Sequence, residues 1–214
     1  MKPSFPCKAR TPVALTALMI WVHALPAAAH HPMGGVTPGN FVEGLLSGLG
    51  HPIIGFDHLL FVFAIGMACF YFGQRLFATV AFLGGAITGT VVHLQNATLP
   101  FADAWVAMSL IVLGILLLRK QEFLKRKAAL VLFALCGIVH GYAYGEAVIG
   151  AEPTPLFAYL AGFTLVQLAI TFCGYLAARY LSRAQPAFHT LKATGGSLAL
   201  VGAGFLAVSL ITQG

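Results

Sequence analysis

Histidine and carboxylate side chains occur inside long apolar runs of this sequence, at three separate places. One group extends from His51 to His58 and includes Asp57, and a second extends from His140 to Glu146. His93 stands alone near the end of a third apolar run. Imidazole together with carboxylate suits nickel, cobalt, zinc or iron, whereas an all-oxygen set suits magnesium or calcium and a thiolate set suits copper(I). The pattern therefore predicts that these residues handle a divalent transition metal.

The predicted metal-handling residues all lie within or beside apolar segments. An ionisable group there costs ~2.5 to 3.5 kcal/mol on insertion scales, so one that is retained faces a polar interior or a pathway. These residues are His51, Asp57, His58, His93, His140 and Glu146, with His30 and His31 as weaker candidates.

Helical geometry limits how these side chains could share one ion. His51 and His58 are seven residues apart, which is ~10.5 Å along a continuous helix, so they could not both bind one metal there. Pro52 suits the first position of a helix, which would make His51 the residue that caps it. Any common site must then be assembled between helices, for instance from Asp57 and His58 together with His93 and His140.

The composition predicts that the chain lies in a lipid bilayer. It is 59% hydrophobic and 8% charged, whereas soluble domains carry about a quarter of their residues as charged groups. We therefore expect an all-α bundle of transmembrane helices. The net charge of +6 does not indicate a nucleic-acid partner, because the basic residues lie in short loops rather than on one solvated face. Cys69, Cys136 and Cys173 lie in apolar segments without metal-ligand spacing and are expected to act as small core residues.

The first 29 residues have the features of a secretory signal. Lys2, Lys8 and Arg10 precede a short apolar stretch, which ends at Ala27-Ala28-Ala29. We predict a cleaved signal over residues 1–29 and one membrane domain over residues 30–214. An uncleaved first anchor is the alternative, and it is less favoured because the apolar stretch is short for a span.

Six further apolar runs are each long enough to cross a bilayer as a helix. Lys and Arg occur between the first and second, third and fourth, and fifth and sixth of these runs, and not in the alternate connections. Because Lys and Arg are retained on the cytoplasmic side, this pattern predicts an inner-membrane protein with both mature termini in the periplasm. The predicted metal-handling residues then lie in the periplasmic half. The runs are residues 54–72, 76–94, 101–118, 128–149, 156–178 and 195–211.

Two pairs of glycines have the G-x-x-x-G spacing that lets membrane helices approach closely. They are Gly85 with Gly89 and Gly141 with Gly145. In a chain with 24 glycines this spacing is equally compatible with ordinary packing.

The two polar motifs resemble a known family. His51-Pro52-x-x-Gly55-x-Asp57-His58 and His140-Gly141-x-Ala143-x-Gly145-Glu146 are similar to motifs of the hydrogenase- and urease-associated nickel/cobalt permeases, the HupE/UreJ family. The resemblance runs from about residue 30 to the end of the chain. It implies that the matching residues of both motifs handle the metal. Val139 stands where an aromatic residue is expected, which affects packing more than ligation.

The sequence predicts uptake of nickel, possibly cobalt in its place, by a secondary or facilitated permease that serves the maturation of a metalloenzyme. Ni²⁺ or Co²⁺ would be the transported ion, and no permanently bound cofactor is expected. No P-loop motif for ATP hydrolysis is present in the sequence. Two alternatives use the same residue types. One is a membrane-embedded zinc-dependent hydrolase, and the other is a periplasm-facing metal sensor or assembly factor.

Overall fold

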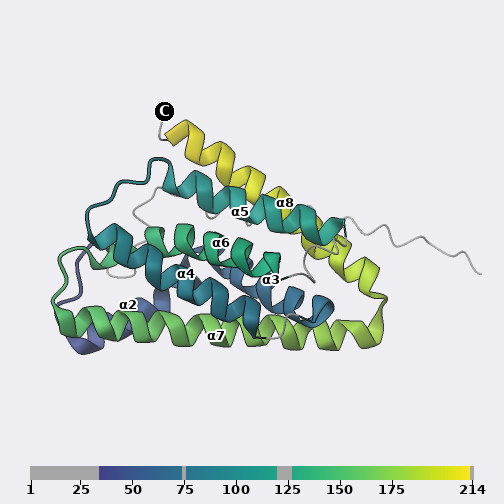
Figure 1. The fold of residues 1–214 in the computed structure, drawn as a ribbon, viewed down its shortest axis with the longest axis horizontal. Helices are drawn as coiled ribbons and strands as arrows, with labels where there is room; N and C mark the ends of the chain where they lie inside the picture. The colour runs from purple at the N-terminus through teal and green to yellow at the C-terminus, as the bar shows by residue number, and fades with distance from the viewer. Residues whose placement is uncertain (1–33, 74–75, 120–126, 213–214) are drawn as a thin grey trace, which may run out of the picture.

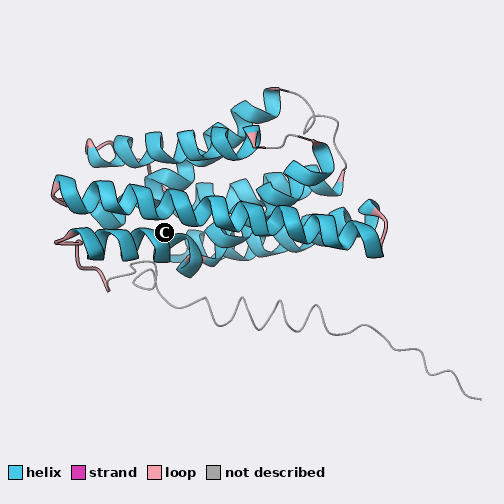
Figure 2. Ribbon diagram, turned by 90° about the horizontal axis from the view of Figure 1, so that it is seen from below, coloured by secondary structure: helices cyan, strands magenta, loops and turns pink. Residues whose placement is uncertain are grey.

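The computed structural model describes residues 34–73, 76–119 and 127–212, and all regular structure among them is helical (Figures 1 and 2). The predicted signal over residues 1–29, together with His30 and His31, lies outside the described residues. The elements are α2 (Phe41–Ile54), α3 (Phe56–Phe72), α4 (Phe77–Leu94), α5 (Ala102–Leu118), α6 (Ala128–Gly145), the 3-10 helix η3 (Glu146–Val148), α7 (Pro153–Ala184) and α8 (Ala187–Thr212). The predicted all-helical membrane bundle is confirmed.

Helix α2 was not expected from the hydropathy pattern. Its start is fixed by a reciprocal cap, in which the Asn40 side chain accepts a hydrogen bond from the Glu43 amide at 3.0 Å and the Glu43 carboxylate accepts one from the Gly39 amide at 2.8 Å. This arrangement satisfies two backbone donors that a helix start leaves exposed. The chain is therefore already helical ten residues before His51.

The prediction that His51 caps a helix is wrong. His51 and Pro52 lie inside α2, and the chain breaks instead at Gly55, whose extended backbone separates α2 from α3. The two helices are bent by 79° at this break. The axial separation calculated for one continuous helix therefore does not apply to His51 and His58.

Glycines bring α4 close to α6 and α5 close to α8. On α4, a Cβ at Gly85 or Gly89 would lie 2.1 or 2.0 Å from a carbonyl oxygen of α6, and one at Gly141 of α6 would lie 1.9 Å from a carbonyl oxygen of α4. Gly114 and Gly195 join α5 to α8 in the same way. The G-x-x-x-G spacing, which the sequence left open, thus coincides with close helix approach at Gly85, Gly89 and Gly141.

Helix α7 packs along both parts of the bent segment. Gly48 of α2 lies against the Tyr159 backbone, and Gly66 of α3 lies against the Thr171 backbone. Residue numbers of the contacts rise together, so α2 packs on the first part of α7 and α3 packs on the part that follows. The break between α2 and α3 therefore lies beside the middle of α7.

Length and composition allow four of the described helices to cross a membrane, and a fifth crossing is possible if α2 and α3 form one broken span. Helix α5 has 17 residues, at the lower limit of ~17 to 25 for a transmembrane helix. The prediction of six spans therefore stays a prediction. Large apolar side chains on the outside of the bundle, such as Phe172 and Val131, fit a surface that faces lipid.

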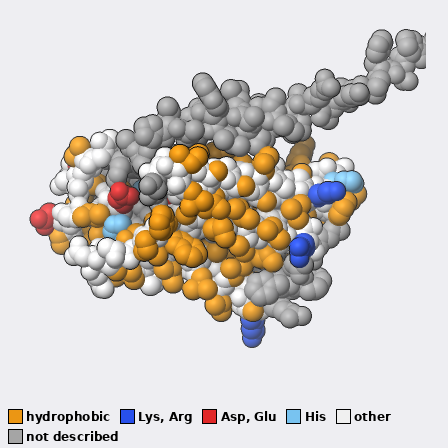
Figure 3. Space-filling model, turned by 90° about the horizontal axis from the view of Figure 1, so that it is seen from above, with side chains coloured by type: hydrophobic (Ala, Val, Ile, Leu, Met, Phe, Trp, Pro, Cys, Tyr) orange, Lys and Arg blue, Asp and Glu red, His pale blue; other side chains and the backbone are white. Residues whose placement is uncertain are grey.

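Charged side chains separate to opposite ends of the bundle (Figure 3). The acidic end carries Glu43, Asp103, Glu146 and Glu152, which lie where α2, α5 and α7 begin and just after α6. The basic end carries Arg119, Lys127, Arg179, Arg183 and Lys192, at the opposite ends of the helices. The two ends of the described bundle thus differ in charge, as expected of a protein whose loops alternate across a membrane.

Candidate metal-handling site

Three imidazoles form a row through the interior of the bundle. The break at Gly55 brings the His51 ring to 6.1 Å from the His58 ring, measured between centroids, and the His58 ring lies 4.9 Å from that of His140. The rings come from α2, α3 and α6 and are all buried. The Tyr144 ring lies beside the row, 5.0 Å from His51 and 4.5 Å from His58.

The tautomer of His51 follows from its contact with Tyr159. The Tyr159 hydroxyl donates its single hydrogen to the Tyr144 carbonyl oxygen at 2.9 Å, and the same hydroxyl oxygen lies 2.9 Å from His51 Nδ1. With the hydroxyl hydrogen on the carbonyl oxygen, Nδ1 is the donor to the hydroxyl oxygen. The lone pair of a neutral His51 is then on Nε2.

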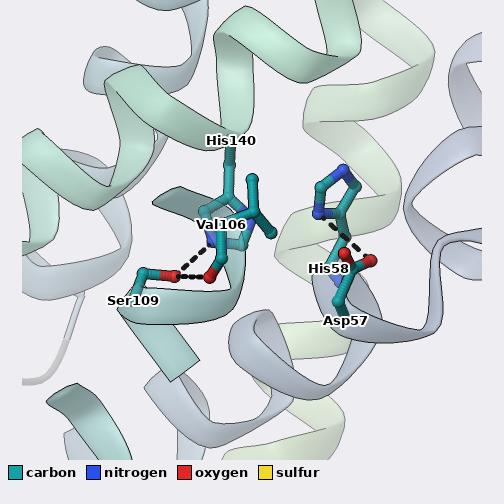
Figure 4. A network of polar contacts seen from close by, with 5 residues as sticks. All are labelled: Asp57, His58, Val106, Ser109 and His140. Atoms are coloured by element: carbon teal, nitrogen blue, oxygen red, sulfur yellow. Dashed lines mark hydrogen bonds and ion pairs between the residues drawn. The ribbon is translucent and has the colours of Figure 1, made fainter. Parts of the chain in front are cut away.

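The tautomer of His140 is fixed in the same manner by Ser109 of α5 (Figure 4). The Ser109 hydroxyl lies 2.6 Å from the Val106 carbonyl oxygen, a distance that requires the serine hydrogen between the two oxygens. His140 Nε2, 2.8 Å from Ser109 Oγ, must therefore be the donor in that contact. The lone pair is left on Nδ1, a buried atom for which the described residues provide no hydrogen-bond partner.

Asp57 lies directly beside His58 in the first turn of α3 (Figure 4). Its carboxylate accepts a hydrogen bond from the His58 backbone amide at 2.8 Å and lies 3.5 Å from His58 Nδ1. A carboxylate next to the non-ligating nitrogen of a histidine orients the ring and increases its basicity toward a metal. Asp57 thus supplies negative charge to the middle of the row, in a buried position.

The described residues contain no group of three or more His, Cys, Asp or Glu side chains placed to hold one ion together. What the structure shows is a succession of imidazoles, with spacings of 6.1 and 4.9 Å between ring centroids. Such a row offers a cation partial coordination at successive positions rather than one closed shell.

Two of the predicted residues lie apart from the row. His93 packs its ring against Tyr142, at 4.1 Å, and its Cβ lies close to Gly145. The predicted grouping of His93 with Asp57, His58 and His140 is therefore wrong in its geometry, because the last turn of α4 faces the end of α6 rather than α3. Glu146 is exposed in η3 at the acidic end.

The sequence reasoning missed Ser109, Tyr144, Tyr159 and Gln167. All four are buried, and the hydroxyl of Tyr144 and both amide atoms of Gln167 have no hydrogen-bond partner in the part of the chain that the structure describes. A sequence signal existed for each, since a polar side chain within an apolar run of a membrane helix usually faces the protein interior.

The fold and this site define a class, the multi-pass helical membrane proteins with a buried histidine and carboxylate cluster. The sequence matches the family described as HupE / UreJ protein over residues 17–205. Protein HupE of Rhizobium leguminosarum bv. viciae is 30% identical over 189 residues, which are 86% of this chain and 92% of that relative. No solved structure matches the chain. The chain belongs to the HupE/UreJ family, as its two polar motifs predicted.

Proposed function

We propose that this protein takes up a divalent transition metal, nickel or cobalt, across the bacterial inner membrane as a facilitated permease that serves metalloenzyme maturation. The observation that carries the proposal is the row of His51, His58 and His140 with Asp57 beside it. Ligands for such an ion succeed one another through a bundle whose remaining interior is largely apolar. Family membership supports the same conclusion.

The charge distribution supports entry from the acidic end. Glu146 and the other acidic residues of that end would attract a cation, which His51 would receive first. His58 and His140 would then replace part of its water shell, and His93 would act at the rim. A membrane potential that is negative inside contributes ~2.3 kcal/mol per charge per 100 mV, so a divalent cation is drawn inward without ATP hydrolysis by this chain.

The orientation has its own test. Reporter fusions after Lys125 and after Pro186 should behave as cytoplasmic, and a fusion after Gly214 should behave as periplasmic. This expectation rests on the alternation of Lys and Arg between the loops. A cytoplasmic C-terminus would place the acidic end inside the cell and reverse the proposed route.

The flux itself is tested with purified protein in liposomes that contain a nickel- or cobalt-sensitive dye. The parent protein should move both ions, or one of them, down an imposed potential. Asp57→Asn keeps the size of the side chain and removes its charge, so it should abolish flux while the protein still folds. His58→Ala should do the same.

The outcomes separate the proposal from its two alternatives. A conduction path must release its ion, so the parent should hold metal loosely and exchange it. Tightly retained zinc in a one-to-one ratio, with no flux, would favour the hydrolase. Reversible nickel or cobalt binding without flux would favour the sensor or assembly factor.

His30 and His31 would help to capture the metal ion outside the cell, since the new N-terminal amine and the His30 imidazole can chelate it together once residue 29 is removed. Replacing both by alanine should reduce uptake only when external metal is scarce. Equal loss at all concentrations would instead place them in the pathway, and unchanged uptake would remove their role.

A further inference from the structure

The face of α7 that points into the bundle continues past the histidine row. Tyr159, Phe163, Gln167 and Thr171 recur every four residues, and all four are buried. Tyr159 contacts His51, and the Phe163 ring lies 5.5 Å from that of Tyr144. Four helical residues rise ~6 Å, so Gln167 and Thr171 lie roughly one and two turns from Phe163 toward the basic end.

Gln167 is the least satisfied side chain on this face. It is 0% exposed, and neither its amide oxygen nor its amide nitrogen has a hydrogen-bond partner within residues 34–73, 76–119 and 127–212. An amide that offers two donors and an acceptor is costly in an apolar interior without partners. A polar species that reaches this position would satisfy it, whereas helix packing alone would be served better by leucine.

Thr171, one turn beyond Gln167, lines a cavity of about 360 Å³ between α3, α4 and α7. Its Oγ1 is buried and has no hydrogen-bond partner in the described structure. Two further polar side chains line the same cavity, with Cys69 Sγ lying 3.8 Å from Thr79 Oγ1. The remaining wall is formed by Leu76, Leu168, Phe172 and Tyr175.

This cavity lies toward the end of the bundle opposite the acidic residues. Cys69 is near the last turn of α3, whereas His58 is in the first turn, and Thr79 is in the first turn of α4. Leu76, Leu168 and Phe172, which line the cavity, are exposed, so the cavity opens at the apolar outer surface of the bundle beside the start of α4. The lining residues from α3, α4 and α7 all place the cavity between the histidine row and the basic end.

We infer that Gln167, Thr171, Cys69 and Thr79 form the inner part of the ion route, between the histidine row and the basic end. The inference rests on the proposed function. The species bound is a partly hydrated divalent transition-metal ion. After it leaves the imidazoles, the ion contacts the amide oxygen, the two hydroxyl oxygens and the sulfur of these side chains. Oxygen groups bind such an ion more weakly than imidazole does, which favours release toward the cytoplasm.

The first test measures flux through variants of α7 in liposomes. Gln167→Leu and Thr171→Val remove polar atoms while keeping the approximate volume, and should lower nickel or cobalt flux by roughly tenfold or more, since tenfold corresponds to about 1.4 kcal/mol, the scale of one hydrogen bond to a charged group. Thr171→Ser, which retains the hydroxyl, should keep most of the flux. Ser209→Ala is the matched control, because Ser209 is another buried hydroxyl without a partner among the described residues but lies on α8.

Folding is measured on the same variants by thermal unfolding in detergent. Gln167→Leu removes an unsatisfied buried amide, so its unfolding temperature should equal or exceed that of the parent. A loss of flux with undiminished stability therefore assigns Gln167 to the route. Parental flux in Gln167→Leu and Thr171→Val would overturn the inference while leaving the proposed function intact, and absent flux in the parent would contradict the proposed function itself.

The second test needs no flux and uses Cys69 as a reporter of water. One variant retains only Cys69 and another retains only Cys136, with the other cysteines replaced by alanine. Inverted membrane vesicles expose the cytoplasmic side to a small, charged thiol reagent. By burial alone Cys136, which is 8% exposed, should react at least as fast as Cys69, which is 3% exposed.

A hydrated route predicts the reverse order. Cys69 should be modified faster than Cys136, and added nickel or cobalt should slow the modification of Cys69. Equal or slower reaction of Cys69, or reaction that the metal leaves unchanged, would show that the cavity is a packing void or a lipid site and would overturn the inference.

Discussion

Helix α6 presents two unlike faces to its neighbours, although the residues that form them are adjacent in sequence. Gly137 and Gly141 face α4 and bring the two backbones into direct contact. His140 and Tyr144 face α3, and each carries a buried polar atom without a hydrogen-bond partner among the described residues. The first face makes close backbone contacts, including a hydrogen bond from the Thr90 hydroxyl to the Gly141 carbonyl oxygen, whereas the second places an imidazole nitrogen and a phenol oxygen in the interior.

Under the proposed function, the residues that stabilise the fold and those that handle the metal therefore occupy separate positions even within one turn of helix. If this separation is correct, changes on the glycine face should damage folding and transport together. Changes on the histidine face should damage transport alone.

The largest effect is expected from Gly141→Ala. The new Cβ would lie 1.9 Å from the Ala86 carbonyl oxygen, so the helices must separate, and overpacking of this kind costs about 1 to 3 kcal/mol or more. Thermal unfolding and flux should both fall. Gly84→Ala is the control, because no atom lies within 4 Å of a Cβ there, and it should be neutral or stabilising. Equal behaviour of the two variants would contradict the tight interface.

His140→Phe should give the opposite pattern, with flux lost and folding kept. The ring is already surrounded by aromatic side chains, with Phe61 at 4.5 Å and Phe82 at 5.5 Å between centroids. Phenylalanine fits these neighbours and removes the unsatisfied Nδ1. The measurements are metal flux in liposomes and unfolding temperature in detergent. His189→Phe, at an exposed position, should change neither, and persistent flux in His140→Phe would remove His140 from the route.

A smaller effect is expected from Ser109→Ala, which leaves the His140 ring in place. Without the serine oxygen, His140 Nε2 loses the acceptor that fixes its tautomer, and changes to such supporting groups typically cost 10- to 100-fold in metal affinity or activity. The half-saturating metal concentration should rise more than the maximal flux falls. Ser109→Thr should restore most of the parental behaviour. A purely structural role for Ser109 would move the unfolding temperature without moving the half-saturating concentration.

The smallest effect is expected at the rim, from Glu146→Gln. Because Glu146 is exposed in η3, its charge is screened by salt and is worth at most about 1 kcal/mol, so uptake at scarce metal should fall only about two- to fivefold at low ionic strength. The difference should vanish at high ionic strength. A large, salt-independent loss would instead make Glu146 a direct ligand and extend the functional face beyond the interior row.

Hydropathy predicted that the long helices exist, but it did not set the limits of all of them, because α7 (Pro153–Ala184) and α8 (Ala187–Thr212) extend well beyond the expected residues 156–178 and 195–211. Residues 76–94 and 101–118 were expected to be spans, and α4 and α5 begin and end within about a residue of those limits. Helix α2 was missed, since its 14 residues include three glycines and a proline and its stability depends on contact with α7. The cap formed by Asn40 and Glu43 was the local signal that could have predicted it.

The individual metal-handling residues could be proposed from the sequence, but their arrangement could not. The contact between His51 and Tyr159 joins residues 108 positions apart, and that between Ser109 and His140 joins residues 31 positions apart. No local pattern encodes such pairs. The bend at Gly55 mattered most, because a continuous helix would have held His51 and His58 ~10.5 Å apart along its axis.

Helix α7 is longer than the hydrocarbon core of a bilayer is thick. Its 32 residues at 1.5 Å per residue give a rod of about 48 Å, well beyond a hydrocarbon core of ~30 Å. The excess must be accommodated by tilt or by extension into the headgroups, where the long side chains of Arg179 and Arg183 can reach phosphates. Because α2, α3 and α7 are locked together by backbone contacts, a change in bilayer thickness would tilt the bent segment with its partner. Lipid chain length would thereby bear on how His51 and His58, which move with α7, are placed relative to His140 on α6.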